Sequence, residues 1–201
     1  LNATGNRTEV EEHDGRRVAY TYDELERLIE ESIFEPGATT ASRTIEYVYD
    51  EVGNRLSRTD SGDGTTIYTY DNNDRLATET TDGENTTYAY DELNRLEQLT
   101  EPDPDGAGTL IAPVTQFGYD LVGNQTQLTD AQGRVTTFGY DERNRLIQIT
   151  DPDPDGAGAL IAPVTGYTYD ATNNQTSMID PLGRTTTFQY DGRNRLTQIT
   201  D

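Results

Sequence analysis

Aromatic side chains recur along this chain in pairs that are separated by one residue and followed by aspartate. Residues at positions i and i+2 lie on the same face of a β-strand, so each pair predicts a strand with an aromatic face. Segment 185–191, TTTFQYD, shows the pattern and is rich in the β-branched and aromatic residues that strands favour. The alternation therefore predicts short strands along most of the chain.

Polar turn residues separate these strands. In segment 190–196, YDGRNRL, aspartate can accept hydrogen bonds from nearby amides, and asparagine or glycine tolerates a positive φ, which predicts a turn. Segment 196–200, LTQIT, is then the return strand, and segment 180–183, DPLG, predicts a second turn. Each repeat of about 21 residues thus predicts one β-hairpin.

The dipeptide Tyr-Asp occurs eight times, at intervals of 20 to 29 residues, and all 13 tyrosines lie in these aromatic-x-Tyr-Asp boxes. We interpret the tyrosine as packing in the sheet and the aspartate as capping the turn, because repetition in every unit favours architecture over a single site. Sugar binding on the aromatic faces is the alternative. The eight pairs are Tyr22 and Asp23, Tyr49 and Asp50, Tyr70 and Asp71, Tyr90 and Asp91, Tyr119 and Asp120, Tyr140 and Asp141, Tyr169 and Asp170, and Tyr190 and Asp191.

These repeats predict a single all-β array over residues 1–201. We expect an antiparallel meander of hairpins that sheet twist coils into a curved or spiral β-sheet shell, similar to a β-solenoid. Residues 101–150 and 151–200 align without a gap and share 33 of 50 residues, which indicates a recent duplication. One stretch departs from the pattern: in segment 23–32, DELERLIEES, the spacing of the apolar residues predicts a short helix.

Composition argues for a thin sheet. Only 32% of the residues are hydrophobic, and tryptophan and cysteine are absent, so aliphatic side chains are too scarce for a thick core. Ladders of aromatic residues across neighbouring strands can replace it, with each cross-strand pair contributing about 0.2–1 kcal/mol. Because one hairpin alone is marginally stable, each repeat needs flanking repeats of the same chain as partners.

The formal charge of −22 excludes two partner classes, since nucleic acids and anionic membranes both attract basic surfaces. All 15 basic residues are arginine. No apolar run approaches the roughly 20 residues of a membrane span. A solvated acidic surface is the simplest interpretation, and cation binding is the alternative. Enzymatic function is not expected, because His13 is the sole histidine and no set of nucleophile, base and acid recurs.

Segments 140–151, YDERNRLIQITD, and 180–201, DPLGRTTTFQYDGRNRLTQITD, resemble YD repeats, which are also called RHS repeats. The resemblance covers nearly the whole chain. It implies a β-strand ribbon that spirals into a hollow shell. In RHS polymorphic toxins and insecticidal toxin complexes such a shell encloses a toxic C-terminal polypeptide, and teneurins use a similar shell in cell-surface adhesion.

The resemblance implies a secreted or cell-surface protein. Because the sequence begins and ends within the pattern, we interpret it as an internal fragment of a longer chain. Three functions are open: a shell segment around a C-terminal toxin or cargo, an extracellular adhesion or fibre protein in which the repeats form a spacer or binding surface, and a calcium-stabilised surface layer or filament. The expected partners are the flanking repeats and either an enclosed toxin or further copies of the chain. Toxin members of the family carry an aspartyl-type self-cleavage segment after the repeats, and we identify no such segment here.

Two acidic stretches, EPDPDGAG at 101–108 and DPDPDGAG at 151–158, begin as calcium loops do, with acids at positions 1, 3 and 5 and glycine at 6. The bidentate glutamate expected at position 12 is absent, and the prolines force extended backbone at the residues before them. We therefore interpret both stretches as lengthened hairpin connections, with calcium as the alternative and no other cofactor expected. The candidate ligands are Asp103, Asp105, Asp151, Asp153 and Asp155.

Arginines follow five of the Tyr-Asp boxes. A charged ladder that binds an anionic ligand is one interpretation. On a chain this acidic we favour the other, in which each arginine pairs with a neighbouring aspartate and packs its stem over the sheet. The residues are Arg55, Arg75, Arg95, Arg145 and Arg195.

Overall fold

The computed structural model describes residues 1–106, 108–156, 158 and 160–201, and the fold is all-β as predicted. The described residues form seventeen strands, which are antiparallel wherever their pairing is described. The strands are β1 (Glu9–Glu11), β2 (Arg17–Tyr22), β3 (Leu28–Phe34), β4 (Arg43–Tyr49), β5 (Arg55–Asp60), β6 (Gly64–Tyr70), β7 (Leu76–Thr81), β8 (Glu84–Tyr90), β9 (Leu96–Thr100), β10 (Val114–Tyr119), β11 (Gln125–Thr129), β12 (Val135–Tyr140), β13 (Leu146–Thr150), β14 (Val164–Tyr169), β15 (Gln175–Ile179), β16 (Thr185–Tyr190) and β17 (Leu196–Thr200).

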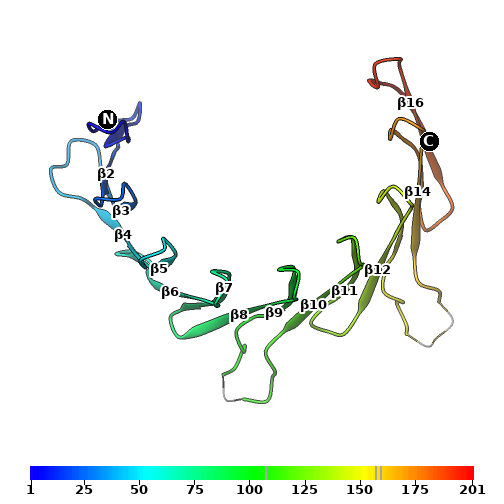
Figure 1. The fold of residues 1–201 in the computed structure, drawn as a ribbon, viewed down its shortest axis with the longest axis horizontal. Helices are drawn as coiled ribbons and strands as arrows, with labels where there is room; N and C mark the ends of the chain where they lie inside the picture. The colour runs from blue at the N-terminus through cyan, green and yellow to red at the C-terminus, as the bar shows by residue number, and fades with distance from the viewer. Residues whose placement is uncertain (107, 157, 159) are drawn as a thin grey trace. The chain divides into compact units, whose positions relative to one another are not determined.

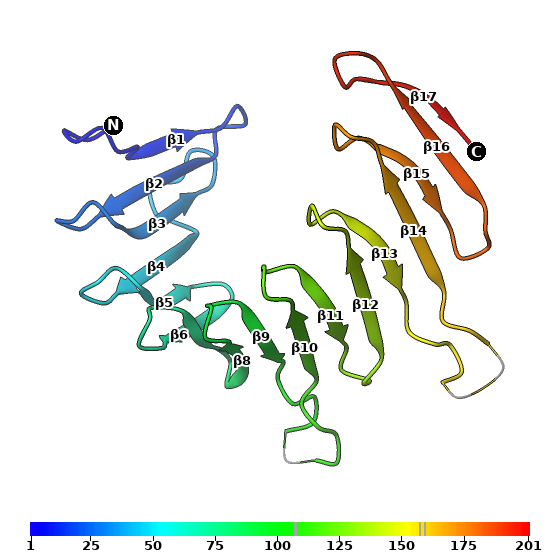
Figure 2. The same cartoon turned by 45° about the vertical axis from the view of Figure 1, so that its right-hand side comes forward.

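The chain divides into two compact units, Leu1–Ala89 with Thr100–Ala112 and Tyr90–Leu99 with Pro113–Asp201. In the first unit each strand from β1 to β8 pairs with the next strand in the sequence (Figure 1). In the second unit the strands from β10 to β17 do the same (Figure 2). Each unit is therefore a meander of hairpins, as the repeat pattern predicts.

The predicted helix over 23–32 is wrong. Residues 23–27 form a turn, and Leu28–Phe34 is strand β3, which pairs with β2 on one side and β4 on the other. The segment carries the same turn chemistry as the other boxes, because Asp23 caps its own turn. Pairing on both sides of β3 overrides the helical spacing of a few apolar residues, since local propensity is weak compared with tertiary pairing.

Two classes of turn connect the strands, and within each unit they lie at opposite ends of the strands (Figure 1). We call the turn after each box a YD turn and the connection on the other side a return turn. YD turns are uniform in length. Return turns vary from the two residues Asp82 and Gly83, both at positive φ, to the long segments 101–113 and 151–163. The acidic stretches are thus lengthened hairpin connections.

Burial is shallow, as expected for a thin sheet. Among the described residues, the buried hydrophobic side chains are Ile45 and Tyr68, and the buried charged side chain is Asp60. Most strand positions are half-buried. The described part of the chain contains no helix that is long and apolar enough to cross a membrane.

Candidate functional site: the Tyr-Asp turns

The YD turns share one backbone geometry. In each turn the carbonyl of the box aspartate accepts a hydrogen bond from the amide three residues later, as between Asp141 and Asn144 at 2.9 Å. That fourth turn residue has a positive φ, 59° at Asn144 and 99° at Gly123, which explains why asparagine, aspartate or glycine usually stands there. The pairing register shifts beside seven of the eight box tyrosines, as between Gly139 and Tyr140. This is the geometry of a hairpin turn with a bulge.

The box aspartate closes this turn with its side chain. In the turn at Asp141, Oδ1 accepts hydrogen bonds from the amides of Arg143 and Arg145 at 2.9 and 3.0 Å, and Oδ2 accepts one from Arg145 Nε at 2.7 Å. In the turn at Asp170, Asn174 takes the place of the arginine, and its Nδ2 donates to Oδ2 at 2.8 Å.

Electrostatics follow from these contacts. The side-chain hydrogen bond from Arg145 lowers the pKa of Asp141 to about 2, and the one from Asn174 lowers the pKa of Asp170 to about 2. These carboxylates stay ionised at neutral pH because the charged form receives several donors. Each of these carboxylates already accepts several hydrogen bonds within its own turn, so its role is to close the turn.

The box tyrosine ties its hairpin to the preceding one. Tyr169 Oη donates to the backbone carbonyl of Leu146 at 2.8 Å, and Tyr49 Oη donates to that of Leu28 at 2.9 Å. The same bond, always to a carbonyl at or before the first residue of an earlier strand, joins Tyr22 to Arg7, Tyr70 to Arg55, Tyr119 to Leu96, Tyr140 to Gln125 and Tyr190 to Gln175. The tyrosine hydroxyl therefore has an architectural partner in each of these hairpins.

The residues opposite the leading aromatic of each box, two positions before the tyrosine, differ between the units. In the first unit tyrosines stand there, and charged residues lie opposite the three whose partners are described: Tyr20 with Glu31, Tyr47 with Arg58, and Tyr68 with Glu79. In the second unit apolar residues lie opposite, and three of the four aromatics are phenylalanine: Phe117 with Leu128, Phe138 with Ile149, Tyr167 with Met178, and Phe188 with Ile199.

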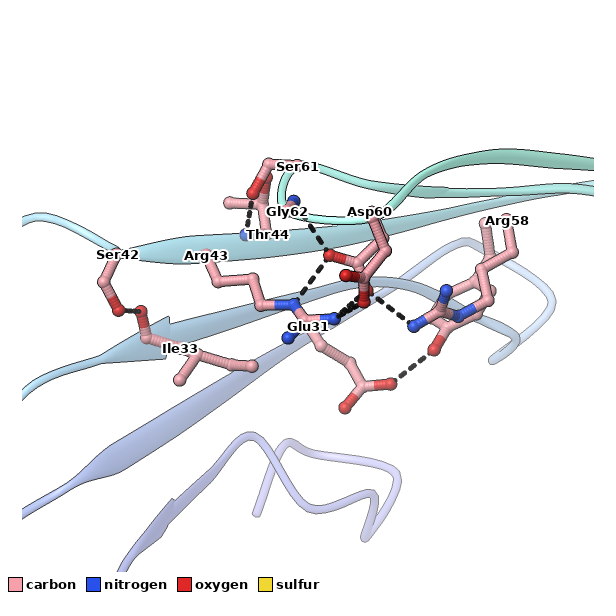
Figure 3. A network of polar contacts seen from close by, with 11 residues as sticks. Glu31, Ile33, Ser42, Arg43, Thr44, Arg58, Asp60, Ser61 and Gly62 are labelled. Carbon is pink, nitrogen blue, oxygen red and sulfur yellow. Dashed lines mark hydrogen bonds and ion pairs between the residues drawn. The ribbon is translucent and has the colours of Figure 1, made fainter. Parts of the chain in front are cut away.

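An ion network forms around the buried carboxylate of Asp60 in the first unit (Figure 3). Asp60 is 1% exposed, and its carboxylate accepts two hydrogen bonds from Arg43, at 2.6 and 2.7 Å, and one from Arg58 at 2.7 Å. Arg43 also pairs with Asp63. The bonds from Arg43 hold the pKa of the Asp60 carboxyl well below its usual range. The network joins strands β4 and β5 through side chains.

Tyr47 extends this polar face. Its hydroxyl donates to Glu31 Oε1 at 2.6 Å. Burial and the neighbouring Glu31 carboxylate raise the pKa of Tyr47 to about 12. The sequence reasoning missed these residues, because charged residues within strands have no local signature. The available signal was the alignment of Asp60 with the return-turn aspartates Asp130 and Asp180.

The candidate calcium ligands bind their own loop. Asp105 Oδ2 accepts hydrogen bonds from the amides of Thr109 and Leu110 at 2.8 and 3.1 Å, and Asp103 Oδ1 accepts one from the Asp105 amide at 3.3 Å. In the second loop Asp155 Oδ2 accepts from Leu160 at 3.1 Å and Asp153 Oδ1 from the Asp155 amide at 3.2 Å, while the Asp151 amide donates to the Pro163 carbonyl at 2.9 Å. Residues 107, 157 and 159 of these stretches lie outside the described residues. Across the described ranges, no three acidic, histidine or cysteine groups are gathered as a metal site.

The arginines that follow the boxes divide into two kinds. Arg75, Arg95, Arg145 and Arg195 each form an ion pair with their box aspartate. Arg55 instead is the first residue of strand β5, because Asn54 occupies the turn position that arginine has in the other four repeats. Its guanidinium lies 4.6 Å from the centre of the Tyr68 ring. Its Nε is buried without a hydrogen-bond partner among the described residues. Arginine thus has two roles: it pairs with the aspartate that closes its turn, or it stacks on an aromatic ring.

The sequence matches the family model described as RHS Repeat at residues 2–32, 49–85, 114–158 and 169–201, which together cover more than half of the chain. The chain belongs to the RHS-repeat family. It is a structural repeat module, in which the aspartate and the tyrosine of the box form hydrogen bonds within the turn and with the preceding hairpin. No match was found among curated proteins.

Solved structures with the same fold include TcdB2-TccC3-Cdc42 and TcdB2-TccC3 without its hypervariable C-terminal region, at 19% and 18% identity. Both have a TM-score of 0.69 and cover 90% of this chain. The structure of TcdB2-TccC3 itself is matched at 18% identity with a TM-score of 0.68. The RHS-repeat chain spans about a tenth of the length of these proteins.

Proposed function

We propose that this RHS-repeat chain forms part of the wall of a hollow β-shell that encloses a C-terminal toxin or other cargo in a large secreted or cell-surface protein. The observation that carries the proposal is the likeness of fold to the TcdB2-TccC3 structures over 90% of the chain. One of those structures lacks a hypervariable C-terminal region, so that protein has a variable segment beyond its fixed part.

The contacts within each unit are those expected for the wall of a shell. Backbone pairing, box-tyrosine bonds and turn-to-turn bonds join each hairpin to its sequence neighbour, so the wall extends by adding hairpins rather than by enlarging a core. Most strand residues are half-buried, which leaves both faces of the sheet partly open to solvent. A thin wall of this kind can separate an enclosed volume from the medium.

Enclosure of the cargo is tested by its protection from a protease. The full polypeptide that contains these repeats is digested with a non-specific protease, and the C-terminal segment is followed by mass spectrometry. We expect slow cleavage of that segment in the intact protein and fast cleavage once Asp60→Asn loosens the wall. Arg184→Gln, at an exposed return turn, is the control and should leave protection unchanged. Equal cleavage of the segment in the intact protein and in isolation contradicts enclosure.

A second function, adhesion or fibre formation outside the cell, is favoured by one observation. Each long return turn presents an exposed Leu-Ile pair: Leu110 and Ile111 are 56% and 85% exposed, and Leu160 and Ile161 are 59% and 86% exposed. Replacing both isoleucines with aspartate should abolish self-association or surface binding, measured by light scattering and cell adhesion, while leaving the melting temperature unchanged. Wild-type association in that variant excludes these loops.

Calcium binding by the long return turns stays a prediction. Asp103, Asp105, Asp151, Asp153 and Asp155 are the residues concerned, and calorimetric titration with calcium tests them directly. Thermal unfolding with and without a chelator gives a second reading. An unchanged midpoint excludes calcium as a structural ligand.

A further inference from the structure

Eight consecutive strands, β10 to β17, carry no charged side chain, although the chain as a whole is strongly acidic. The sequence contains 37 acidic and 15 basic residues. None of them lies in the described strands β10 to β17, whose polar residues are threonine, serine, glutamine and tyrosine. Every strand from β1 to β8 except β6 contains at least one charged residue. From β10 onwards the charges are therefore confined to the segments between and after the strands.

These uncharged strands have a polar side, opposite to the leading aromatics of the boxes. We call it the neutral face and define it by two rows of residues that strand pairing places side by side: Gln127, Thr137 and Thr150, and Gly139, Gln148 and Gly166. Gln127, Thr137 and Gln148 are exposed, although strands β11, β12 and β13 are each paired on both sides (Figure 2). The exposure of the neutral face is thus a property of the middle of the sheet and not of a sheet edge.

Side chains of the neutral face bond to one another. Gln127 Nε2 donates to Thr129 Oγ1 at 3.1 Å, and Gln148 Nε2 donates to Thr150 Oγ1 at 3.0 Å. Each glutamine thus bonds to the threonine two residues later, on the same face of its strand. A polypeptide that touches this face gains little by replacing such bonds, because the net contribution of one hydrogen bond is only about 1 kcal/mol.

The opposite face of the same strands is apolar, with Phe117 against Leu128 and Phe138 against Ile149. Contact with an apolar face holds a polypeptide through burial, at about 25 cal/mol for each Å² removed from water. A charged face attracts or repels according to sign over about 10 Å. The neutral face does neither. Of the two faces of the second unit, it is therefore the one that can touch a polypeptide of any composition without retaining or rejecting it.

We infer that the neutral face of the second unit is the side of the wall that meets the enclosed polypeptide. This inference rests on the proposed enclosure and adds the face against which the cargo lies. The occupant is a segment of the parent polypeptide outside residues 1–201. The chain spans about a tenth of the length of the solved relatives, so in proteins of that length most of the polypeptide lies outside a segment of this size.

Two adjacent threonines test the orientation, because they are the same residue on opposite faces. Thr136 pairs with Leu128 on the apolar face, and Thr137 pairs with Gln127 on the neutral face. The chain contains no cysteine, so Thr136→Cys and Thr137→Cys each introduce one thiol into these repeats. Each variant of the full polypeptide is treated with a small maleimide, or with a maleimide on a polyethylene glycol too large to enter a shell. Mass spectrometry follows the loss of the unmodified tryptic peptide 135–143, which holds both positions.

The ratio of large-reagent to small-reagent rate at each position carries the result. We expect this ratio to be about tenfold lower at position 137 than at position 136, because the large reagent reaches an enclosed face only when the wall opens. A lower ratio at position 136 overturns the inference while leaving enclosure intact. Equal ratios at the two positions overturn it as well. If both also equal the ratios of the same variants unfolded in urea, enclosure itself fails, and with it the proposed function.

Cross-linking gives an independent reading. Gln148→Cys and Thr165→Cys place a benzophenone maleimide on opposite faces of neighbouring strands, since Gln148 belongs to the neutral face and Thr165 pairs with Ile149. After irradiation of the full polypeptide, we expect cross-links to the C-terminal segment from position 148 and not from position 165. Cross-links from position 165 alone, from both positions equally, or from neither while the protease assay shows protection contradict the assignment of the face.

Discussion

The two units of this RHS-repeat chain share their YD turns and differ in the residues opposite the leading aromatics. In the first unit charged residues lie there, and the neighbouring Asp60 is fully buried between two arginines. In the second unit the same positions hold leucine, isoleucine and methionine, and Asp130 and Asp180 pair locally with Arg134 and Arg184. One turn chemistry thus supports a polar face and an apolar face.

This difference indicates which contacts the repeat requires. Hydrogen bonds of the box aspartate and the box tyrosine occur in both units, so they define the hairpin and its attachment to the next. The face between the turns accepts either polar or apolar pairs, because most residues of these pairs are only half-buried. In this repeat the turn residues therefore determine the fold, and the strand residues determine whether the face of the sheet is polar or apolar.

Removing the buried carboxylate should have the largest effect. Asp60→Asn removes the buried charge that Arg43 and Arg58 share, and solvent offsets only part of the loss because these two side chains are 40% and 30% exposed. We expect the midpoint of thermal unfolding, followed by circular dichroism, to fall by at least about 5 °C. Asp130→Asn, at the equivalent exposed turn, should change the midpoint by less than about 2 °C. Equal effects of the two variants would erase the distinction between the units.

Exchanging the character of the strand pairs should have the next largest effect. Leu128→Glu places a charge opposite Phe117 and should lower the free energy of unfolding of the second unit by about 1–2 kcal/mol. Glu79→Leu, opposite Tyr68 in the first unit, should change stability by less than about 0.5 kcal/mol. Native-state hydrogen exchange assigns each change to its unit. A large loss in the Glu79 variant would show that the first unit requires its polar face.

Deleting a box hydroxyl should cost less and should cost the same in both units. Tyr49→Phe and Tyr169→Phe each leave one half-buried carbonyl, of Leu28 or Leu146, without its donor. We expect a loss of about 1 kcal/mol in each case, measured by urea denaturation. A loss confined to one unit would contradict the view that the turns are the shared element.

The smallest effect appears only in alkaline solution. Burial and Glu31 raise the pKa of Tyr47 to about 12, above the ordinary value near 10. A raised pKa means that the neutral phenol stabilises the fold fully below about pH 10 and that this contribution is lost as the pH rises towards 12. Absorbance titration of tyrosinate should resolve this late step, and Tyr47→Phe should remove it. Phe138, in the second unit, has no group that titrates.

Local sequence predicted more of the turns than of the strand contacts. The strands, the hairpin meander and the capping role of Asp141 follow from period-two aromatics and from residues that tolerate a positive φ, because both signals lie within a few residues. The apolar spacing in segment 23–32 gave a wrong helix, since a few apolar positions fit either period. The contacts of Arg43, Asp60 and Tyr47 could not be predicted, because they depend on the register between strands.

The sequence by itself determined the repeat, its hairpins and its turn chemistry, because each depends on short-range backbone preferences and on hydrogen bonds within five residues. Only the tertiary structure decided which hairpin surfaces meet. Asn174 lies 20 residues from Asn194, and Arg145 lies 25 residues from Asp170, and pairing across the sheet brings each couple within hydrogen-bonding distance. The residue at the fifth turn position, arginine or asparagine, is visible in the sequence, but its contacts with the next hairpin depend on the register of neighbouring strands.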